Sequence, residues 1–153
     1  MDIQDDLQLK ILQPGHATEI RNLECGLLEI SEPDPIRREM MSWHARWRPE
    51  ALEHYLPLGW SFGVWQGDKL VAYFLAQPLL FVSGLTQTLW VEHLSFKEKK
   101  AADKLVECAY RWSRDKHLQR IVFANSESYK DVLLDWEAQP VQESMHQLQT
   151  AKY

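Results

Sequence analysis

The chain has 153 residues and a mass of 18.0 kDa, the size of one globular domain. Hydrophobic residues make up 45% and charged residues 25%, a balance that excludes a disordered chain. The net charge of −5 argues against a protein built to coat nucleic acid, because phosphate binding needs a basic surface. The longest apolar stretch, 70–82, is interrupted by Gln77 and Pro78, so we expect no membrane span.

Glycine and cysteine set further limits. The chain has six glycines and none follows Gly84, so the C-terminal half lacks a glycine-rich phosphate loop. Cys25 and Cys108 are too few and too far apart for a disulfide framework. The acidic start, MDIQDDLQ, lacks the basic and apolar parts of a signal peptide. These features predict a cytoplasmic protein with reduced thiols.

The spacing of apolar residues predicts the secondary structure in chain order. A helix over 36–56 is expected to break before Pro49, and Pro78 must lie at a strand edge or a bulge. Ser126 is a candidate cap for the last helix. The expected elements are a strand over 7–12, helices over 17–30 and 36–56, strands over 60–66, 70–82 and 86–96, a helix over 101–116, a strand over 120–124, a helix over 126–138 and a strand over 141–150.

This order, β-α-α-β-β-β-α-β-α-β, contains an antiparallel meander followed by a β-α-β crossover. It predicts an α/β (α+β) fold with a mixed, mostly antiparallel sheet and helices on both faces. No linker or repeat divides the chain, so residues 1–153 are expected to form a single domain. Trp60, Phe62 and Trp65 are expected in the core of the sheet, and Cys108 is expected to pack in the buried stripe of its helix.

Three segments resemble the GNAT superfamily of acyl-CoA-dependent N-acyltransferases. Residues 105–123 resemble the family's third helix and the strand after it, with Leu105-Val106, Trp112 and Arg120-Ile121 at characteristic positions. Residues 7–17 resemble its opening strand and helix, and residues 67–72 resemble a hairpin turn of its sheet. The element order follows the family along essentially the whole chain.

The resemblance implies an acetyltransferase that moves an acetyl group from acetyl-CoA to an amine by direct attack, without a metal. The acceptor would be a small molecule or a protein. A second hypothesis is a GNAT-fold protein without catalysis that binds or regulates, with or without CoA. A third is a cleft that takes another acyl donor or an anionic ligand through its lysines. No HExxH, CxxC or carboxylate-histidine spacing indicates a metal site.

The segment that the resemblance places at the CoA diphosphate departs from the family pattern. The family has Arg or Gln, two residues, Gly, one residue, then Gly or Ala; here Lys100 replaces the central glycine. Lysine side chains would then replace some backbone amides as anion ligands, although a solvated turn of mixed charge is an equal alternative. The expected donor-binding residues are Leu94, Lys97, Lys99, Lys100, Ala101 and Ala102.

Three residues are candidates for proton transfer. Glu92 and His93 are adjacent on a strand, so they point to opposite faces unless a bulge intervenes, and only one would face the cleft. The family's tyrosine, often the proton donor to the CoA thiolate, is replaced by Trp136, which leaves Tyr129 as the substitute acid. The alternatives are an exposed glutamate, an ordinary histidine and a tyrosine that only packs.

The acceptor wall of the family corresponds to residues 42–48. Trp43 and Trp47 are four residues apart, so on one helix they would share a face, and Arg46 beside them would give an aromatic, basic rim. Such a rim would suit an acidic or aromatic acceptor. The alternative is that both tryptophans anchor the core.

The C-terminus sets the last expectation. Only 13 residues follow Pro140, so the family's last two strands must be short, merged into one or completed by another subunit. The last option motivates the expectation of a homodimer. The strand over 86–96 and the strand over 120–124 should also separate near Glu92, because a donor cleft requires a gap there.

Overall fold

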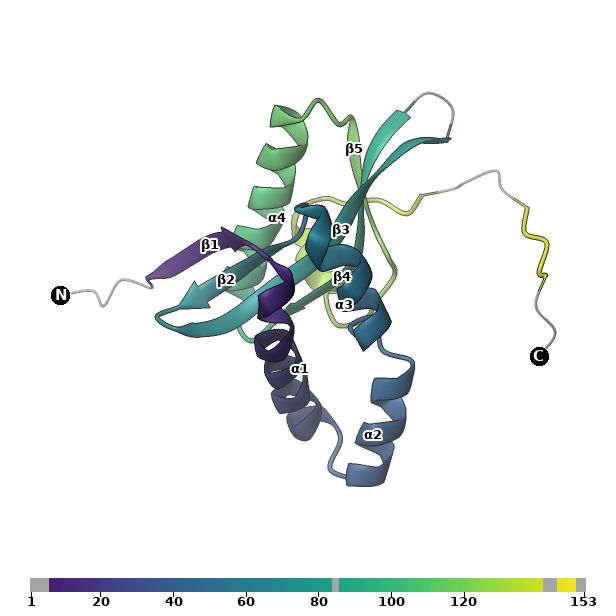
Figure 1. Cartoon of the computed structure of the whole chain (residues 1–153). Coiled ribbons are helices and arrows are strands. Elements are labelled where there is room, and N and C mark those ends of the chain that lie inside the picture. Colours follow the sequence, from purple (N-terminus) through teal and green to yellow (C-terminus); the bar gives the residue numbers. More distant parts are fainter. Residues whose placement is uncertain (1–5, 84–85, 142–145, 151–153) are drawn as a thin grey trace.

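A computed structural model describes residues 6–83, 86–141 and 146–150 (Figure 1). Every expected element from residue 7 to residue 138 has a counterpart, with the long second helix divided in two. The strands are β1 (Leu7–Ile11), β2 (Phe62–Gln66), β3 (Lys69–Ser83), β4 (Thr86–Phe96) and β5 (Arg120–Phe123). The helices are α1 (Ala17–Ser31), α2 (Pro35–Trp43), α3 (Pro49–Tyr55), α4 (Lys99–Asp115) and α5 (Lys130–Asp135), with short 3-10 turns η1 (Pro14–His16) and η2 (Leu56–Leu58).

The five strands form one sheet in the order β1-β2-β3-β4-β5. Neighbours are antiparallel from β1 to β4, and β5 joins β4 in parallel after the α4 crossover. This is the mixed, mostly antiparallel sheet that the element order predicts. At Gly67, φ is +63° in the tight β2–β3 turn, a conformation that favours glycine.

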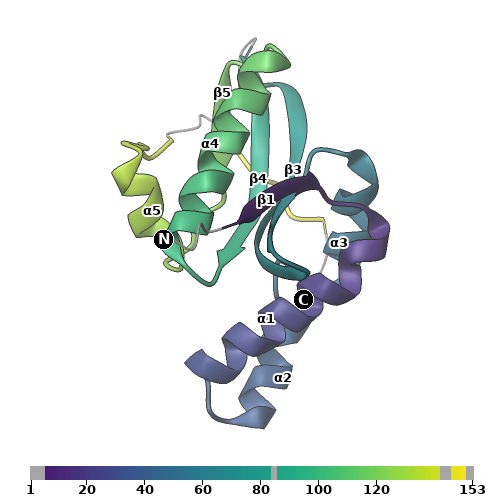
Figure 2. The same ribbon diagram turned by 90° about the vertical axis from the view of Figure 1, so that its left-hand side faces the viewer.

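Helices cover both faces of the sheet, as predicted (Figure 2). On one face, α4 packs its alanines and Leu105 against strand residues such as Phe74 and Leu89. On the other face, α1 and α3 pack against Trp65, Tyr73 and Leu75. Phe62 and Trp65 are buried, and Trp60 packs edge-on against Trp112, so these aromatic residues belong to the core as expected.

Pro78 shows how β3 changes its neighbours along its length. β2 pairs with β3 only as far as Phe74, whereas β4 continues beside β3 and places Leu89 opposite Pro78. The missing N–H of Pro78 therefore faces a side without a strand among the described residues. The expectation of an edge position is confirmed.

The break expected before Pro49 in the helix over 36–56 is confirmed, because α2 ends at Trp43 and α3 begins at Pro49. Two expectations for the C-terminal part are wrong in detail. The last helix spans only Lys130–Asp135 and begins after Tyr129, so Ser126 is not its cap. The last strand is absent from residues 141 and 146–150, which have no regular structure, while residues 142–145 lie outside the described part.

None of the helices within residues 6–83, 86–141 and 146–150 combines the length and the apolar character that a membrane crossing requires.

Candidate functional site

The pairing of β4 with β5 stops partway along β4. The last paired residues are Val91 and Phe123, and the Ala124 N–H then donates to the Val91 carbonyl at 2.9 Å. β4 continues to Phe96 while the chain after β5 turns away toward α5. The two strands therefore separate at Glu92, as expected, and from that residue onward one edge of β4 has no partner strand among the described residues.

A β-bulge lies at the point of separation. His93 pairs with Leu75 and Val91 pairs with Ala76, so Glu92 has no partner on β3. The extra residue breaks the alternation of the strand. Glu92 contacts Tyr55 of α3, and His93 contacts Glu24 of α1, so both side chains reach the face covered by α1 and α3. The sequence predicts opposite faces for the two residues unless a bulge intervenes, and the bulge at Glu92 is that exception.

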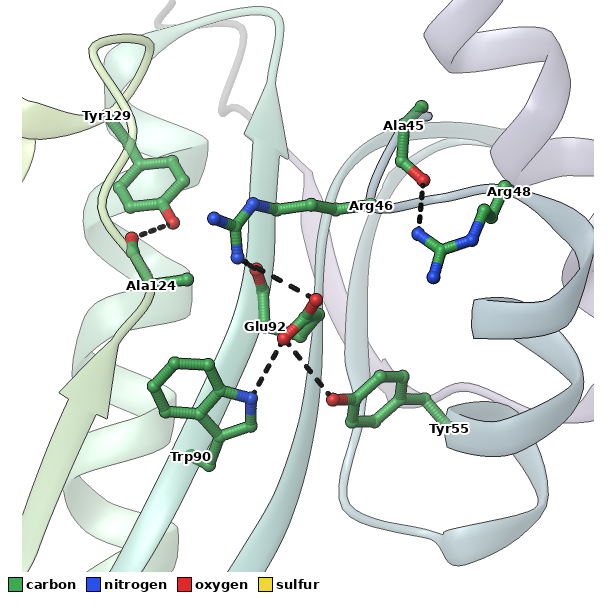
Figure 3. A network of polar contacts seen from close by, with 8 residues as sticks. All are labelled: Ala45, Arg46, Arg48, Tyr55, Trp90, Glu92, Ala124 and Tyr129. Carbon is green, nitrogen blue, oxygen red and sulfur yellow. Dashed lines mark hydrogen bonds and ion pairs between the residues drawn. The ribbon is translucent and has the colours of Figure 1, made fainter. Parts of the chain in front are cut away.

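The Glu92 carboxylate is the centre of a polar network (Figure 3). Its Oε2 accepts hydrogen bonds from the Trp90 indole at 2.9 Å and from the Tyr55 hydroxyl at 3.4 Å. Its Oε1 lies 3.7 Å from Nη1 of Arg46, which also donates to the Glu92 backbone carbonyl at 3.2 Å. Burial, followed by the negative charge of Glu92, raises the pKa of Tyr55.

Arg46 reaches this network from the turn between α2 and α3. The next residue, Trp47, is buried in the α1–α3 core and anchors the turn. The Arg46 side chain places its guanidinium between Glu92 and Tyr129 (Figure 3). Trp43 ends α2 and is 60% exposed, so Trp43 and Trp47 do not share a helix face. The structure brings Arg46 to the site and leaves Trp43 outside it.

Tyr129 lies on the opposite side of the gap, just before α5. Its side chain is buried, and its hydroxyl donates to the Ala124 carbonyl at the end of β5. Burial raises its pKa to about 12, while the charge of Arg46 lowers and that of Glu92 raises this pKa. The phenol is therefore neutral at pH 7, and its proton is donated to the Ala124 carbonyl. Trp136 points elsewhere: its indole donates to Asp103 of α4.

His93 belongs to a second network beside the first. Its Nε2 lies 3.0 Å from Oε1 of Glu24, and the Tyr73 hydroxyl donates to the same oxygen at 2.6 Å. Glu24 is 5% exposed, and Nδ1 of His93 is buried without a hydrogen-bond partner among the described residues. This network ties α1 to β3 and β4, so His93 holds the wall of the site and does not enter the Glu92 cluster.

The unpaired part of β4 lines a cleft of about 400 Å³. α1 forms one wall from Leu27 to Ser31, and Ser128 contributes from the far side. The Lys97 N–H donates to the Val71 carbonyl of β3, and hydrogen-bonded positions alternate in an antiparallel ladder. The backbone N–H groups of Leu94 and Phe96 must therefore face the cleft. These groups can donate to a carbonyl or amide placed along β4.

The connection from β4 to α4 consists of only Lys97 and Glu98. Lys99 forms ion pairs with Asp103 and with Asp135, which raise the pKa of its amine through hydrogen bonding. Lys100 lies 3.5 Å from Glu98. Lys97 is exposed and has no ion pair within the described residues. Ala101 and Ala102 are buried against the sheet, so only the three lysines of the expected donor-binding set can reach a ligand with their side chains.

Sequence reasoning missed Tyr55, Trp90 and Glu24. Trp90 lies two residues before Glu92 on the same strand, and that spacing could have indicated a shared face. Glu24 falls within the apolar stripe of α1, where a charged residue signals a buried pair. Tyr55 is 37 positions from Glu92, and no local pattern connects the two.

Other candidate sites are weaker. Among the described residues, no three His, Cys, Asp or Glu side chains gather in a way that could hold a metal ion. A hollow of about 570 Å³ lies on the outer surface of α4 and is lined by Glu107, Tyr110 and Trp136, away from the unpaired edge of β4. Burial raises the pKa of Cys108 to about 11, so this thiol is not a nucleophile at neutral pH.

Comparisons with known proteins agree with this architecture. No protein-family model matches the chain, and no curated protein matches it significantly. Solved structures do match over nearly their whole length. A GCN5-related N-acetyltransferase from Ralstonia eutropha JMP134 superposes with a TM-score of 0.67 at 12% identity, covering 93% of this chain and 98% of that one.

Two further solved structures give the same result. An aminoglycoside acetyltransferase from an uncultured soil metagenomic sample, in complex with sisomicin, has a TM-score of 0.64 at 14% identity and covers 99% and 100% of the two chains. A predicted acetyltransferase with acetyl-CoA from Clostridium acetobutylicum has a TM-score of 0.66 at 8% identity, covering 93% and 96%. The chain has the GNAT fold, as the sequence resemblance implies.

Proposed function

We propose that the protein transfers an acetyl group from acetyl-CoA to an amine in the cleft between β4 and β5. The observation that carries this proposal is the convergence of a carboxylate, Glu92, with free backbone N–H groups at the point where the strands separate. The structural neighbours support acyl transfer as the class of reaction, because they are described as acetyltransferases.

The chemistry follows from the positions of these groups. The acceptor amine attacks the thioester carbonyl, and the negative charge that develops on the carbonyl oxygen is stabilised by the Leu94 N–H. The C–S bond then breaks, the amine proton passes to Glu92 directly or through water, and the CoA thiolate takes a proton. Tyr129 is the proposed donor of that proton, because its hydroxyl borders the gap and would exchange its bond to the Ala124 carbonyl for one to the thiolate.

The diphosphate of the donor would lie at the N-terminus of α4. Lys97 is the cation best placed to contact it, and Lys100 is the second. Side-chain ammonium groups would supply part of the anion binding that glycine-rich loops supply through backbone N–H groups. His93 acts as a positioning residue, because its bond to Glu24 fixes the strand beside the bulge.

The test combines a thiol-release assay with mass spectrometry of the product, using acetyl-CoA and a panel of primary amines. We expect release of CoA in step with formation of an N-acetyl product. Glu92→Gln should lower kcat about 10²- to 10⁴-fold, because it removes the base but keeps the shape. Glu50→Gln is the matched control, since Glu50 is an exposed residue of α3 with a side chain that is 76% accessible.

The outcome against the proposal is also defined. CoA release by Glu92→Gln at the wild-type rate would show that Glu92 takes no proton. If acetyl-CoA binds but none of the amines causes release of CoA, the proposed transferase activity is wrong.

A further inference from the structure

Arg46 and Glu92 place opposite charges side by side at the point where β4 and β5 separate. The guanidinium Nη1 lies 3.7 Å from Oε1 of the carboxylate, a longer contact than a direct charge-assisted hydrogen bond. Both groups keep contact with solvent, since the Arg46 side chain is 39% accessible and the Glu92 side chain 24%. Each charge therefore neutralises the other only in part.

The two groups also retain unused hydrogen-bonding capacity. Arg46 uses only Nη1, for the Glu92 carbonyl and carboxylate; its Nε and Nη2 contact no partner within residues 6–83, 86–141 and 146–150. On Glu92, Oε2 accepts from Trp90 and Tyr55, whereas Oε1 has only the long contact to Arg46 within the described part of the chain. The free donors of a guanidinium form a planar fork that matches a carboxylate.

The surroundings hold both groups in place. Trp47 follows Arg46 in the chain and is buried, so it anchors the turn that carries the guanidinium. The Trp90 and Tyr55 hydrogen bonds fix the Glu92 carboxylate (Figure 3). A site with a fixed cation and a fixed anion next to each other selects a ligand that carries the opposite charges at the same short separation.

From this arrangement we propose that the acceptor is a free α-amino acid or a closely similar zwitterion. Its carboxylate binds the unused fork of Arg46, and its amine binds Oε1 of Glu92, where the proton is removed. This inference rests on the proposed acetyl transfer for its catalytic consequence. Arg46 is the specificity-determining residue.

Turnover of matched acceptors tests the proposal. The panel pairs an amino acid with its amide and with the amine that lacks the carboxylate, for example phenylalanine, phenylalaninamide and phenethylamine, and alanine, alaninamide and ethylamine. We expect kcat/KM to favour the amino acid about 10- to 100-fold, the range for a hydrogen-bonded charge pair. Arg46→Gln should abolish that preference, and Arg46→Lys should keep part of it, because lysine retains the charge without the fork.

Arg48→Gln is the matched control. Arg48 lies two residues further along the same turn, bonds to the Ala45 carbonyl and lies 3.8 Å from Glu50, so it has no contact with Glu92. This variant should keep the wild-type preference. Equal kcat/KM for acid, amide and amine in the wild type would overturn the proposal, as would a preference that survives in Arg46→Gln.

A binding measurement separates this proposal from the proposed function. Calorimetry with the amino acids alone, without acetyl-CoA, should give binding in the wild type and about 10-fold weaker binding in Arg46→Gln. If acetyl-CoA fails to bind while the amino acid binds through Arg46, the transferase proposal fails and the zwitterion site stands. If amines are acetylated but a carboxylate on the acceptor improves neither turnover nor binding, the zwitterion proposal is wrong and the transferase proposal stands.

Discussion

The bulge at Glu92 is the residue-scale feature on which the site depends. In a regular strand Glu92 and His93 would face opposite sides of the sheet, but the bulge places both beside α1 and α3. It also frees the Glu92 carbonyl from the ladder, and Arg46 donates to it. One unpaired residue therefore brings a base, a cation and a cleft together.

Tyr129 gives a pH-dependent prediction. Its pKa rises from 10.0 to about 12 on folding, so its stabilising contribution is complete below about pH 10 and is lost as the pH approaches about 12. In Tyr129→Phe we expect a lower free energy of unfolding at about pH 8, by about 1 kcal/mol, because the bond to Ala124 is gone. By about pH 11 the difference should shrink, since only the wild type loses the contribution of the phenol.

Urea denaturation at both pH values measures this difference. Tyr110→Phe is the control, because Tyr110 is 51% exposed on α4. If the difference in free energy of unfolding between the wild type and Tyr129→Phe stays constant with pH, burial does not hold the phenol in its neutral form.

At the scale of elements, α2 and the turn after it differ sharply in how they are held. α2 has no buried residue and is capped by Asp34, which accepts from the Ile36 N–H at 3.0 Å. The turn after it is fixed by Trp47, which is 8% exposed. Amphipathic spacing alone could not separate these two roles, because Trp43 and Trp47 are four residues apart and would share a face only if the helix continued.

The two tryptophans make a matched pair for a stability test. We expect Trp47→Ala to lower the free energy of unfolding by about 3–5 kcal/mol, the cost of removing a large buried aromatic side chain. Trp43→Ala should change it by less than about 0.5 kcal/mol, because Trp43 is 60% exposed. Chemical denaturation followed by circular dichroism measures both. Equal losses in the two variants would contradict the assigned positions.

The N-terminus of α4 gives the second element-scale prediction. The double variant Lys97→Ala, Lys100→Ala should weaken acetyl-CoA binding about 3- to 30-fold, because two ammonium contacts to phosphate are lost. Arg114→Ala, Lys116→Ala removes two cations from the opposite end of the same helix and should leave the affinity unchanged. If both double variants bind acetyl-CoA with the wild-type affinity, Lys97 and Lys100 do not contact the donor.

At the scale of the whole molecule, the fold was more predictable than the site. Strands such as β4 and helices such as α4 were predictable because their apolar periodicity reflects burial on the sheet. Arg46, Glu92 and Tyr129 were found as candidates one by one, but their meeting depends on a bulge, a helix break and a strand separation. Pro49 indicated the helix break and the family resemblance implied the strand separation, but no local pattern placed the bulge at Glu92 or brought Tyr55 to it.

The homodimer stays a prediction. Among the described residues, β5 pairs only with β4, so its outer edge has no neighbouring strand. Light scattering should give twice the mass of one chain if a second copy covers this edge. A strict monomer would contradict the prediction and leave the fold unaffected.

Isothermal titration calorimetry with acetyl-CoA and with free CoA tests the central claim most directly, because it requires no knowledge of the acceptor. We expect saturable binding of both ligands to a single site per chain. The thermal midpoint of the protein should rise with ligand concentration, since only the folded chain offers the cleft. If neither ligand binds at millimolar concentration, the cleft between β4 and β5 is not a donor site and the protein is not an acetyl-CoA-dependent transferase.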